Sequence, residues 1–271
     1  MHIQAVLFDW AGTTVDYGSR APVKVFVEIF HRLGIEITEA EARGPMGQAK
    51  REHIASLLAV PRVAALWKDK FGSAPCSADV DRLYADFLPL QLSVLSQGSD
   101  VIPGIPKLIA ELRSRGLKIG SSTGYTRALM EAVIPAARAQ GYSPDVVVCS
   151  DEVPAGRPMP WSNFRACEAL GVYPPTAVLV VDDTPIGIQA ARNAGMWVAG
   201  VTMTGNGLGL SQEEAESLPE SDLNHRLSFI EEQFLAAGAH FVLRAATDLL
   251  PVLDQINAQH VSEAAGSMGK R

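Results

Sequence analysis

The sequence lacks the features that mark secreted, membrane-embedded or disulfide-bonded proteins. No apolar run reaches the roughly 18 residues expected of a membrane-spanning helix, and the first apolar run is cut short by Asp9 with no basic segment before it. We therefore expect neither a membrane span nor a signal peptide. The three cysteines, Cys76, Cys149 and Cys167, include no CxxC pair. Neither a disulfide framework nor a zinc knuckle is predicted, and a cytoplasmic protein is the expectation.

The sequence also has fewer basic than acidic residues. The chain of 271 residues carries 30 acidic and 23 basic side chains, a formal charge of −7, which argues against a nucleic acid or an anionic membrane as the main partner. Apolar residues make up 47% and charged residues 20%, which is typical of a globular protein with one large domain or a main domain with an insertion. A small-molecule partner, including an anion in a local basic pocket, stays open.

Short β-branched runs alternate with helical patterns along most of the chain. The runs are AVLFDW, KIGSST, DVVVCS, AVLVVDD and WVAGVT, and several of the helical segments between them end at a glycine. This alternation predicts an α/β fold with a Rossmann-like parallel sheet. In such sheets the functional groups gather at the carboxyl ends of the strands, which is where Asp9, Thr123, Asp182 and Asp183 lie.

The segment 19–97 interrupts this alternation with helical patterns alone. Its first helix carries an apolar stripe, and Thr38 with Glu41 forms a capping box for a second helix. A later helix places Lys50 and His53 on neighbouring faces, because residues three apart are adjacent on a helix. We predict an α/β core domain of residues 1–18 and 98–260, an inserted all-helical cap domain of residues 19–97, and a disordered tail of residues 261–271.

Side chains at successive strand ends suit phosphate chemistry. Alone, Asp9 could be a turn residue, a helix cap, a metal ligand or a nucleophile, and the structural roles are the commoner ones. The GTT turn that follows it offers amide and hydroxyl donors for phosphate oxygens. Thr123 adds a further hydroxyl, and Arg157 adds a fixed cation after a third strand. Asp182 and Asp183 could hold Mg²⁺ through oxygen ligands.

The motifs FDWAGTTVDYG, GPMGQAKREHI, STGYTR, PAGRPMPW, VVDDTP and NAGMWVAGV together resemble those of haloacid dehalogenase-like hydrolases over nearly the whole chain. They are most similar to the phosphonatase branch, because the first motif occurs together with a lysine in the second. The resemblance implies hydrolysis of the carbon–phosphorus bond of phosphonoacetaldehyde to acetaldehyde and inorganic phosphate, in the degradation of phosphonates such as 2-aminoethylphosphonate. It also implies Mg²⁺ as cofactor and a homodimer formed through the cap, with the first cap helix as a candidate interface.

Ala11 separates this branch from the phosphatases of the superfamily, which usually carry a second aspartate there to protonate a departing alkoxide. Cleavage of a carbon–phosphorus bond expels a carbanion instead, which needs an electron sink. The resemblance implies that Lys50 forms an imine as that sink, that Asp9 becomes an aspartyl phosphate, and that His53 transfers protons. The ordinary pKa of a lysine is about 10.4, so burial and nearby positive charge are expected to depress the pKa of Lys50.

The resemblance also assigns the remaining site residues. The metal ligands are Asp9, the carbonyl of Ala11 and Asp183, with Asp182 as a candidate further acid because Gly187 stands where some relatives have an aspartate. The substrate and phosphate site comprises Thr13, Met46, Gly47, Thr123, Gly124, Tyr125 and Arg157. His53 as an ordinary helix residue and Met46 as a packing residue are the plain alternatives.

Two other functions stay open on the sequence. A general phosphatase or phosphomutase would act on an oxygen ester, and both Ala11 and Lys50 argue against it. A catalytically silent relative that binds a phosphorylated metabolite would be expected to have lost Asp9, Lys50 or Arg157, all of which are present. The glycine-rich segment 204–210 lacks the spacing of a phosphate-binding fingerprint and is predicted only as a loop.

Overall fold

The computed structural model describes residues 2–95 and 100–268, and a six-stranded parallel sheet lies at its centre. The strands are β1 (Ala5–Phe8), β2 (Lys118–Ser122), β3 (Val146–Val148), β4 (Val178–Asp182), β5 (Trp197–Val201) and β6 (Phe241–Leu243). Their order in the sheet is β3-β2-β1-β4-β5-β6, so the predicted Rossmann-like α/β fold is confirmed. The chain builds outward from β1 on one side and from β4 on the other, which places the switch point of the sheet between β1 and β4.

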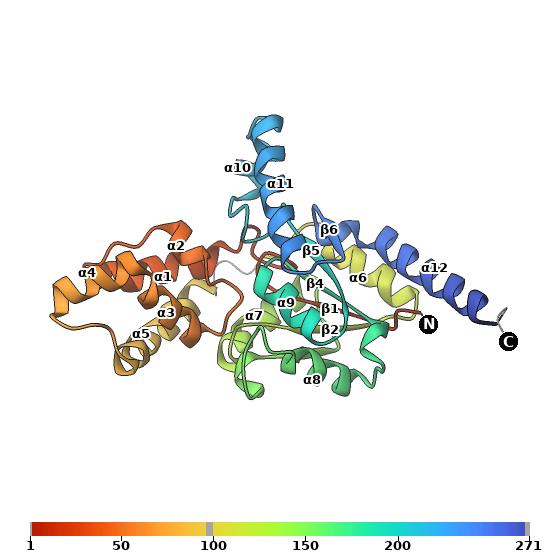
Figure 1. Cartoon of the computed structure of the whole chain (residues 1–271), viewed down its shortest axis with the longest axis horizontal. Coiled ribbons are helices and arrows are strands. Elements are labelled where there is room, and N and C mark those ends of the chain that lie inside the picture. Colours follow the sequence, from red (N-terminus) through yellow and green to blue (C-terminus); the bar gives the residue numbers. More distant parts are fainter. Residues whose placement is uncertain (1, 96–99, 269–271) are drawn as a thin grey trace.

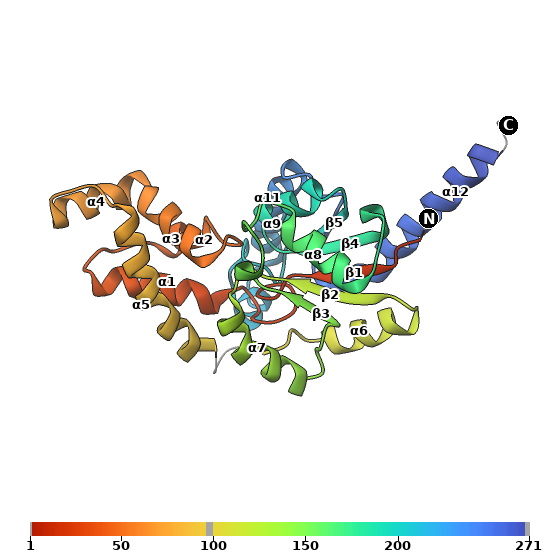
Figure 2. The same cartoon turned by 90° about the horizontal axis from the view of Figure 1, so that it is seen from below.

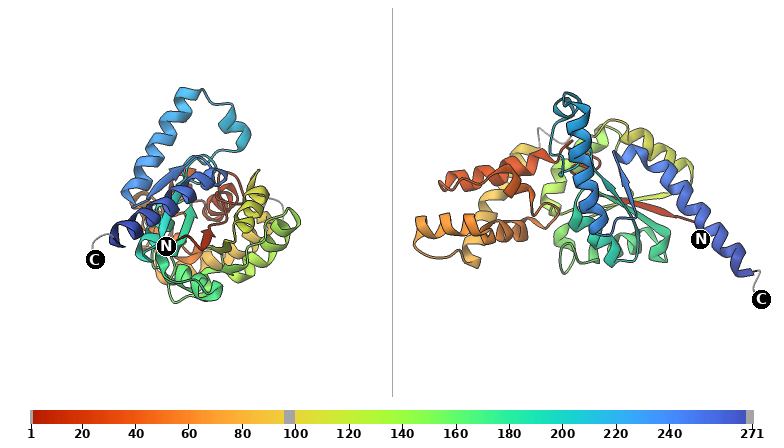
Figure 3. Two further views of the ribbon diagram at one scale, coloured as in Figure 1. Left: turned by 90° about the vertical axis from the view of Figure 1, so that its right-hand side faces the viewer. Right: turned by 45° about the horizontal axis from the view of Figure 1, so that its top comes forward.

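Helices cover both faces of this sheet (Figure 3). One face packs against α6 (Ile105–Ser114), α7 (Arg127–Ala139) and α12 (Leu249–Met268). The other packs against α8 (Trp161–Leu170), α9 (Pro185–Asn193) and α11 (Glu220–Ala236), with the short α10 (Gln212–Glu216) before α11. Three short 3-10 turns complete the list: η1 (Ser150–Glu152), η2 (Pro175–Ala177) and η3 (Ala246–Asp248). Among the described residues, no helix is long and apolar enough to cross a membrane.

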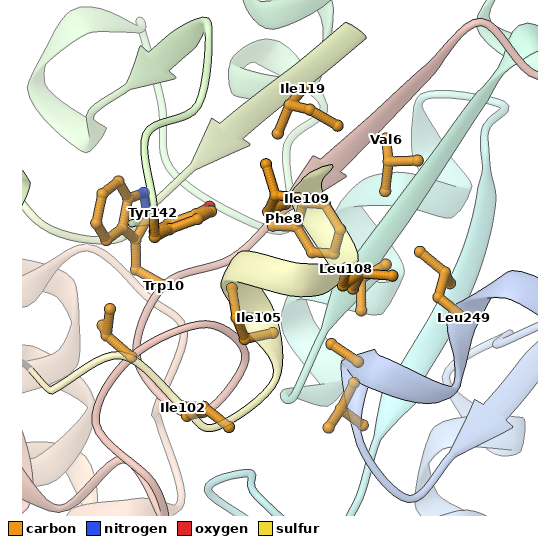
Figure 4. Packing of buried hydrophobic residues seen from close by; sticks show 14 of the residues in the cluster. Val6, Phe8, Trp10, Ile102, Ile105, Leu108, Ile109, Ile119, Tyr142 and Leu249 are labelled. Carbon is orange, nitrogen blue, oxygen red and sulfur yellow. The ribbon is translucent and has the colours of Figure 1, made fainter. Parts of the chain in front are cut away.

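The central strand β1 is buried on both faces, as its uninterrupted apolar sequence predicts. Successive strand residues point to opposite faces, so Val6 and Phe8 belong to the cluster that includes Ile109 and Ile119, shown in Figure 4. Directly after β1, the Trp10 ring packs edge-on against another ring, with centroids 5.0 Å from Tyr142. This packing fixes the backbone on either side of Asp9.

The helices α1 (Arg20–Arg32), α2 (Glu39–Arg43), α3 (Lys50–Ala59), α4 (Pro61–Phe71) and α5 (Ser77–Leu95) form a separate group beside the sheet, at the left of Figures 1 and 2. We call α1–α5 with their connecting loops the cap helices and the rest the core. The capping box of Thr38 and Glu41 at the start of α2 is confirmed. The apolar stripe of α1 lies inside a hydrophobic cluster of these helices, with Phe26 and Phe30 fully buried. That stripe is therefore not an exposed surface, which removes the reason for placing a dimer interface on it.

The predicted domain limits stay a prediction, and the limit between residues 97 and 98 lies outside the described residues. At the other end, α12 continues to Met268, so the structure places residues 261–268 of the predicted disordered tail in a helix. The segment VSEAAGSM contains no proline to stop the helix and includes two alanines, the strongest helix formers. Residues 269–271 of that tail lie outside the described residues.

Candidate active site

A small cavity lies between the cap helices and the carboxyl ends of the strands. We call it the active-site cavity, and its lining comprises Asp9, Ala11, Ser19, Pro22, Met46, Gly47, Gln48, Lys50, Thr123, Gly124, Tyr125, Arg157, Asp183 and Thr184. All predicted site residues except Thr13, His53 and Asp182 therefore meet in one place. The cavity volume is about 20 Å³, which holds roughly one water molecule. The cap helices therefore lie close against the core at this point.

Asp9 follows β1 at the switch point of the sheet. Its main-chain N–H donates to the carbonyl of Val181 at 2.9 Å, and the Thr14 hydroxyl donates to its carbonyl at 3.0 Å. Its carboxylate Oδ1 lies 2.8 Å from Nη2 of Arg157. Burial raises the pKa of the Asp9 carboxyl to about 7, although the charge of Arg157 opposes this shift. Further positive charge at the cavity would favour the ionised carboxylate that a nucleophile requires.

Arg157 is held between two carboxylates. Besides its contact with Asp9, its Nη1 lies 3.1 Å from Oδ2 of Asp182, and Nη2 donates to the carbonyl of Ser122 at 2.9 Å. Burial lowers the pKa of Arg157, but the charges of Asp182 and Asp9 outweigh burial and raise that pKa above its usual value. The guanidinium is therefore a permanent cation, aimed at the carboxylate of Asp9.

Asp182 does not line the active-site cavity, although it contacts Arg157, which does. Its Oδ1 accepts hydrogen bonds from the main-chain N–H of Thr184 at 2.9 Å and from the Thr184 hydroxyl at 2.7 Å, while Oδ2 contacts Arg157. A Cβ built on Gly187 would overlap the Asp182 carboxylate. The carboxylate thus occupies the space that a side chain at position 187 would need, and it holds Arg157 and the start of α9.

Asp183 points into the cavity beside Asp9. Its Oδ2 accepts the main-chain N–H of Asn206 at 2.7 Å, and the hydroxyl of Thr13 donates to Oδ1 at 3.4 Å. Burial, followed by the negative charges of Asp9 and Asp182, raises the pKa of Asp183 well above its usual value. Thr13 therefore contacts the predicted metal ligand Asp183 and does not line the cavity.

Lys50 brings an amine from the cap helices to this cluster. It is the first residue of α3 and only 3% exposed, and its Nζ lies 4.8 Å from the ring centroid of Tyr125 and 5.5 Å from that of Phe26. It forms no salt bridge within the described part of the chain. Burial lowers the pKa of Lys50 to about 8, against the opposing charge of Asp9, which confirms the expected direction of the shift.

His53 lies one turn further along α3, fully buried and outside the cavity lining. Its ring stacks on Phe26 with centroids 3.8 Å apart, and its Nε2 lies 2.9 Å from the carbonyl of Ala42. A carbonyl only accepts, so Nε2 carries the proton and Nδ1 is a bare acceptor. Nδ1 has no hydrogen-bond partner among the described residues. Burial and the charge of Lys50 lower the pKa of His53 well below its usual value, so the ring is neutral.

Two glycines allow the loop before α3 to lie directly on the core. A Cβ on Gly47, whose φ is +95°, would lie 2.6 Å from the hydroxyl oxygen of Thr184, and a Cβ on Gly124 would lie 2.7 Å from the carbonyl of Gln48. Both distances are too short for a side chain. The two predicted site glycines are therefore places where cap and core lie too close together for a side chain.

Comparison with known proteins identifies the family. Residues 3–195 match the family model for haloacid dehalogenase-like hydrolases. The phosphonoacetaldehyde hydrolase of Paraburkholderia phytofirmans is 46% identical over 258 residues, which cover 95% of this chain and 97% of that protein. The chain belongs to the phosphonoacetaldehyde hydrolase family. This confirms the resemblance found in the sequence, and the chain is a hydrolase of the haloacid dehalogenase-like type.

Two further relatives of this family extend over almost the whole chain. The phosphonoacetaldehyde hydrolase of Bacillus cereus is 45% identical over 261 residues, which are 96% of this chain and 99% of that protein. The crystal structure of a phosphonoacetaldehyde hydrolase-like protein from Oleispira antarctica superposes with a TM-score of 0.94 at 38% identity, covering 96% of this chain and 94% of that one. A β-phosphoglucomutase from Clostridium difficile, at 18% identity and a TM-score of 0.65, shares the fold alone.

The oxygen atoms at this site suit a magnesium ion. Haloacid dehalogenase-like hydrolases use a metal cofactor, and Asp9, Ala11 and Asp183 line one cavity. The two carboxylates are buried, and Asp9 helps to raise the pKa of Asp183, a repulsion that a divalent cation would relieve. In residues 2–95 and 100–268, no three histidine, cysteine, aspartate or glutamate side chains converge on a common metal position. Two carboxylates and a carbonyl suit Mg²⁺, which keeps several of its waters.

Five further residues belong to the site although the sequence did not predict them there. Ser19, Pro22, Gln48 and Thr184 line the cavity, and Asn206 holds Asp183 through its main-chain N–H. Thr184 precedes Pro185 at the start of α9 and accepts the N–H of Gly187, a helix-capping pattern that is visible in the sequence. A main-chain contact such as that of Asn206 leaves no signal in the residue type.

Proposed function

We propose that this hydrolase cleaves the carbon–phosphorus bond of phosphonoacetaldehyde to acetaldehyde and inorganic phosphate, in the degradation of phosphonates such as 2-aminoethylphosphonate. The observation that carries the proposal is the buried amine of Lys50, with its pKa lowered to about 8, in the same cavity as Asp9. The names of the relatives support the substrate. Ala11 lines the cavity at the position where a phosphatase that acts on an oxygen ester would carry an acid. An alanine at this position supports a leaving group that departs through carbon.

The first step forms an imine on Lys50. The neutral amine adds to the aldehyde carbon, water is lost, and the imine takes up a proton. The bare Nδ1 of His53, one helical turn away, is the proposed acceptor in these proton transfers, acting through water. The protonated imine can receive an electron pair from the adjacent carbon, which prepares the carbon–phosphorus bond for cleavage.

Asp9 then attacks phosphorus. The new bond joins its carboxylate oxygen to phosphorus, the carbon–phosphorus bond breaks, and its electron pair moves into the imine to give an enamine on Lys50. Arg157, 2.8 Å from the Asp9 carboxylate, favours the ionised form of that carboxylate and orients it. Thr123, Gly124 and Arg157 are the proposed partners of the phosphoryl oxygens, while Met46, Gly47 and Tyr125 enclose the aldehyde end.

Two hydrolyses complete the cycle. The enamine takes a proton on carbon, and water releases acetaldehyde and free Lys50. Water also attacks the aspartyl phosphate, releasing inorganic phosphate and restoring Asp9. When bound, Mg²⁺ would supply positive charge to the phosphoryl oxygens; Asp9, the carbonyl of Ala11 and Asp183 are the proposed ligands. Thr13 would orient Asp183, and Asp182 would orient Arg157 without touching the ion.

Reductive trapping tests the proposal most directly. The enzyme is treated with phosphonoacetaldehyde, Mg²⁺ and borohydride, and the modified peptide is mapped by mass spectrometry. A reduced adduct on Lys50, with acetaldehyde and phosphate from the untreated enzyme, is the expected result, and Lys50→Arg should give neither adduct nor turnover because a guanidinium forms no imine. Phosphate release from ordinary phosphate esters without any adduct would replace the proposal with an oxygen-ester phosphatase.

Three further points belong to the proposal. We propose that residues 19–97 act as a cap domain on the core domain, because α1–α5 pack around a hydrophobic cluster of their own. A homodimer rests on the family resemblance and is tested by light scattering after gel filtration. The cytoplasm is the proposed location, since the unpaired and exposed thiol of Cys76 suits a reducing compartment.

A further inference from the structure

The glycine-rich loop 204–210 contacts three parts of the molecule: the cap helices, Asp183, and the segment around Gly18 and Ser19. We call that segment the crossing, because there the chain first passes from the core to the cap helices. The carbonyl of Thr204 accepts the N–H of Gly18 at 2.7 Å, and its hydroxyl donates to the carbonyl of Gly12 at 2.7 Å. Asn206, two residues further on, donates its main-chain N–H to Oδ2 of Asp183 at 2.7 Å. The loop therefore contacts both the crossing at Gly18 and a carboxylate of the active site.

Arg43, the last residue of α2, joins the cap helices to this loop. Its Nη1 donates to the carbonyl of Gly18 at 2.9 Å and to Oδ1 of Asn206 at 3.1 Å, and its Nη2 donates to the carbonyl of Gly209 at 2.9 Å. Longer contacts reach the carbonyls of Ser19 at 3.4 Å and Asn206 at 3.5 Å. In return, Nδ2 of Asn206 donates to the carbonyl of Arg43 at 3.2 Å. One guanidinium thus connects the cap, the crossing and the loop.

The partners of Arg43 are neutral oxygens, and it forms no salt bridge with any described residue. Burial of the guanidinium lowers the pKa of Arg43, so its position costs free energy that an adjacent carboxylate would normally offset. The arginine fixes the relative position of its partners, because its planar guanidinium can donate hydrogen bonds in several fixed directions at once. The loop is shaped to admit it: Gly209 has φ +68°, and a Cβ there would lie 2.6 Å from Cζ of Arg43.

We propose that Arg43 and Asn206 are positioning residues, through which seating of the cap helices on the core orients Asp183. Arg43 holds the loop 204–210 against the cap, and the main-chain N–H of Asn206 then fixes the carboxylate of Asp183. Loss of Arg43 would release the loop and the crossing together, although neither residue lines the active-site cavity. Asp183 enters this inference as a site residue on the strength of the proposed function, whereas the mechanical link does not depend on the substrate.

Hydrogen exchange followed by mass spectrometry tests the link without any turnover. In Arg43→Met, the amides of Gly18 and Asn206 should exchange at least about tenfold faster than in the wild type, while the strands β1 and β4 keep their protection. Arg82→Met is the matched control, because Arg82 pairs with Asp79 inside the cap helices. Arg43→Lys should show a smaller increase in exchange than Arg43→Met, since one ammonium cannot supply the Nη1 contacts with Gly18 and Asn206 and the Nη2 contact with Gly209 together.

Kinetics then separate a positioning role from a merely structural one. Arg43→Met should lower kcat by about tenfold or more, with a smaller change in KM, as for residues that orient a ligand without touching substrate. Asn206→Ala should give a similar loss, and the double variant should be no worse than either single one, because both break the same link. Unchanged exchange at Asn206, or additive losses, would overturn the proposal. If the wild-type protein is inactive on phosphonoacetaldehyde, but Arg43→Met shows the predicted faster exchange, the proposed function is overturned and the link from Arg43 to Asp183 is supported.

Discussion

The Nζ atom of Lys50 lies 4.8 Å from the ring centroid of Tyr125, so a side chain of the cap helices rests against an aromatic residue of the core. An aromatic face favours the ammonium form of a lysine by about 0.5–2 kcal/mol. Burial acts in the opposite direction and is the larger effect, because the pKa of Lys50 falls to about 8. Contact between cap and core therefore favours the neutral amine, which the proposed imine formation requires.

The rate of imine formation should follow the titration of Lys50. With a pKa of about 8, about one lysine in ten is neutral at pH 7, compared with fewer than about one in a thousand at the ordinary pKa. The rate of reductive trapping by cyanoborohydride should therefore rise about tenfold per pH unit below pH 8 and level off above it. A rate that keeps rising towards pH 10 would contradict a depressed pKa at this site.

Replacing Lys50 by methionine should stabilise the folded protein. A lysine whose pKa falls on folding destabilises the native state while it is charged, and the shift from 10.5 to about 8 corresponds to roughly 3 kcal/mol. The gain in the free energy of unfolding caused by Lys50→Met should be full below pH 8, shrink as the pH rises, and vanish above about pH 10.5. Urea denaturation at pH 7 and pH 10 measures it. Lys24→Met, at an exposed position of α1, is the control and should change stability little at either pH.

Asp9→Asn should separate the two halves of the proposed reaction. The amide keeps the shape of the side chain but is not a nucleophile, so phosphate release should fall by at least about a thousandfold. Trapping of the imine on Lys50 should persist, because that step uses the amine of the cap helices. Both products are measured in the same incubation, phosphate by a colour assay and the adduct by mass spectrometry. Normal phosphate release would remove Asp9 as the nucleophile.

The sheet and the strand-end residues could be predicted because each depends on local patterns. Buried parallel strands have continuous apolar sequences, and a parallel sheet brings their carboxyl ends to one edge, so Asp9, Thr123 and Asp183 were placed correctly at strand ends. The orientation of individual carboxylates could not be predicted. Asp182 and Asp183 are neighbours on one strand end, yet one turns to Arg157 and the other into the cavity, because adjacent residues of a strand point to opposite sides.

Contacts made by the main chain were also hidden from the sequence. The segment 204–210 has no recognised motif, and only the folded chain shows that it carries Asn206 to Asp183 and receives Arg43. The structural role of Gly47 and Gly124, which the resemblance placed in the site, was hidden in the same way. In the structure each leaves room for a close contact between cap and core, where a Cβ would overlap an atom of the other segment; this requirement is set by a distant segment of the chain.

Gly187→Ala should destabilise the protein, although alanine normally stabilises a helix relative to glycine by about 1 kcal/mol. The added Cβ would overlap the Asp182 carboxylate, which cannot retreat because Arg157 and Thr184 hold it. We expect a loss of about 1–3 kcal/mol in the free energy of unfolding, as in other overpacked sites.

Asp182→Ala combined with Gly187→Ala should lose less than the sum of the two single losses, because shortening Asp182 frees the space that the methyl group needs. Gly44→Ala is the control, since a Cβ there meets its nearest atom at 3.4 Å and the backbone is already helical. Denaturant unfolding of the wild type, the two single variants and the double variant gives the coupling energy between positions 182 and 187. A coupling below about 0.5 kcal/mol would show that the two positions are independent, and the orientation of Asp182 beside Arg157 would then need another cause than the open space at Gly187.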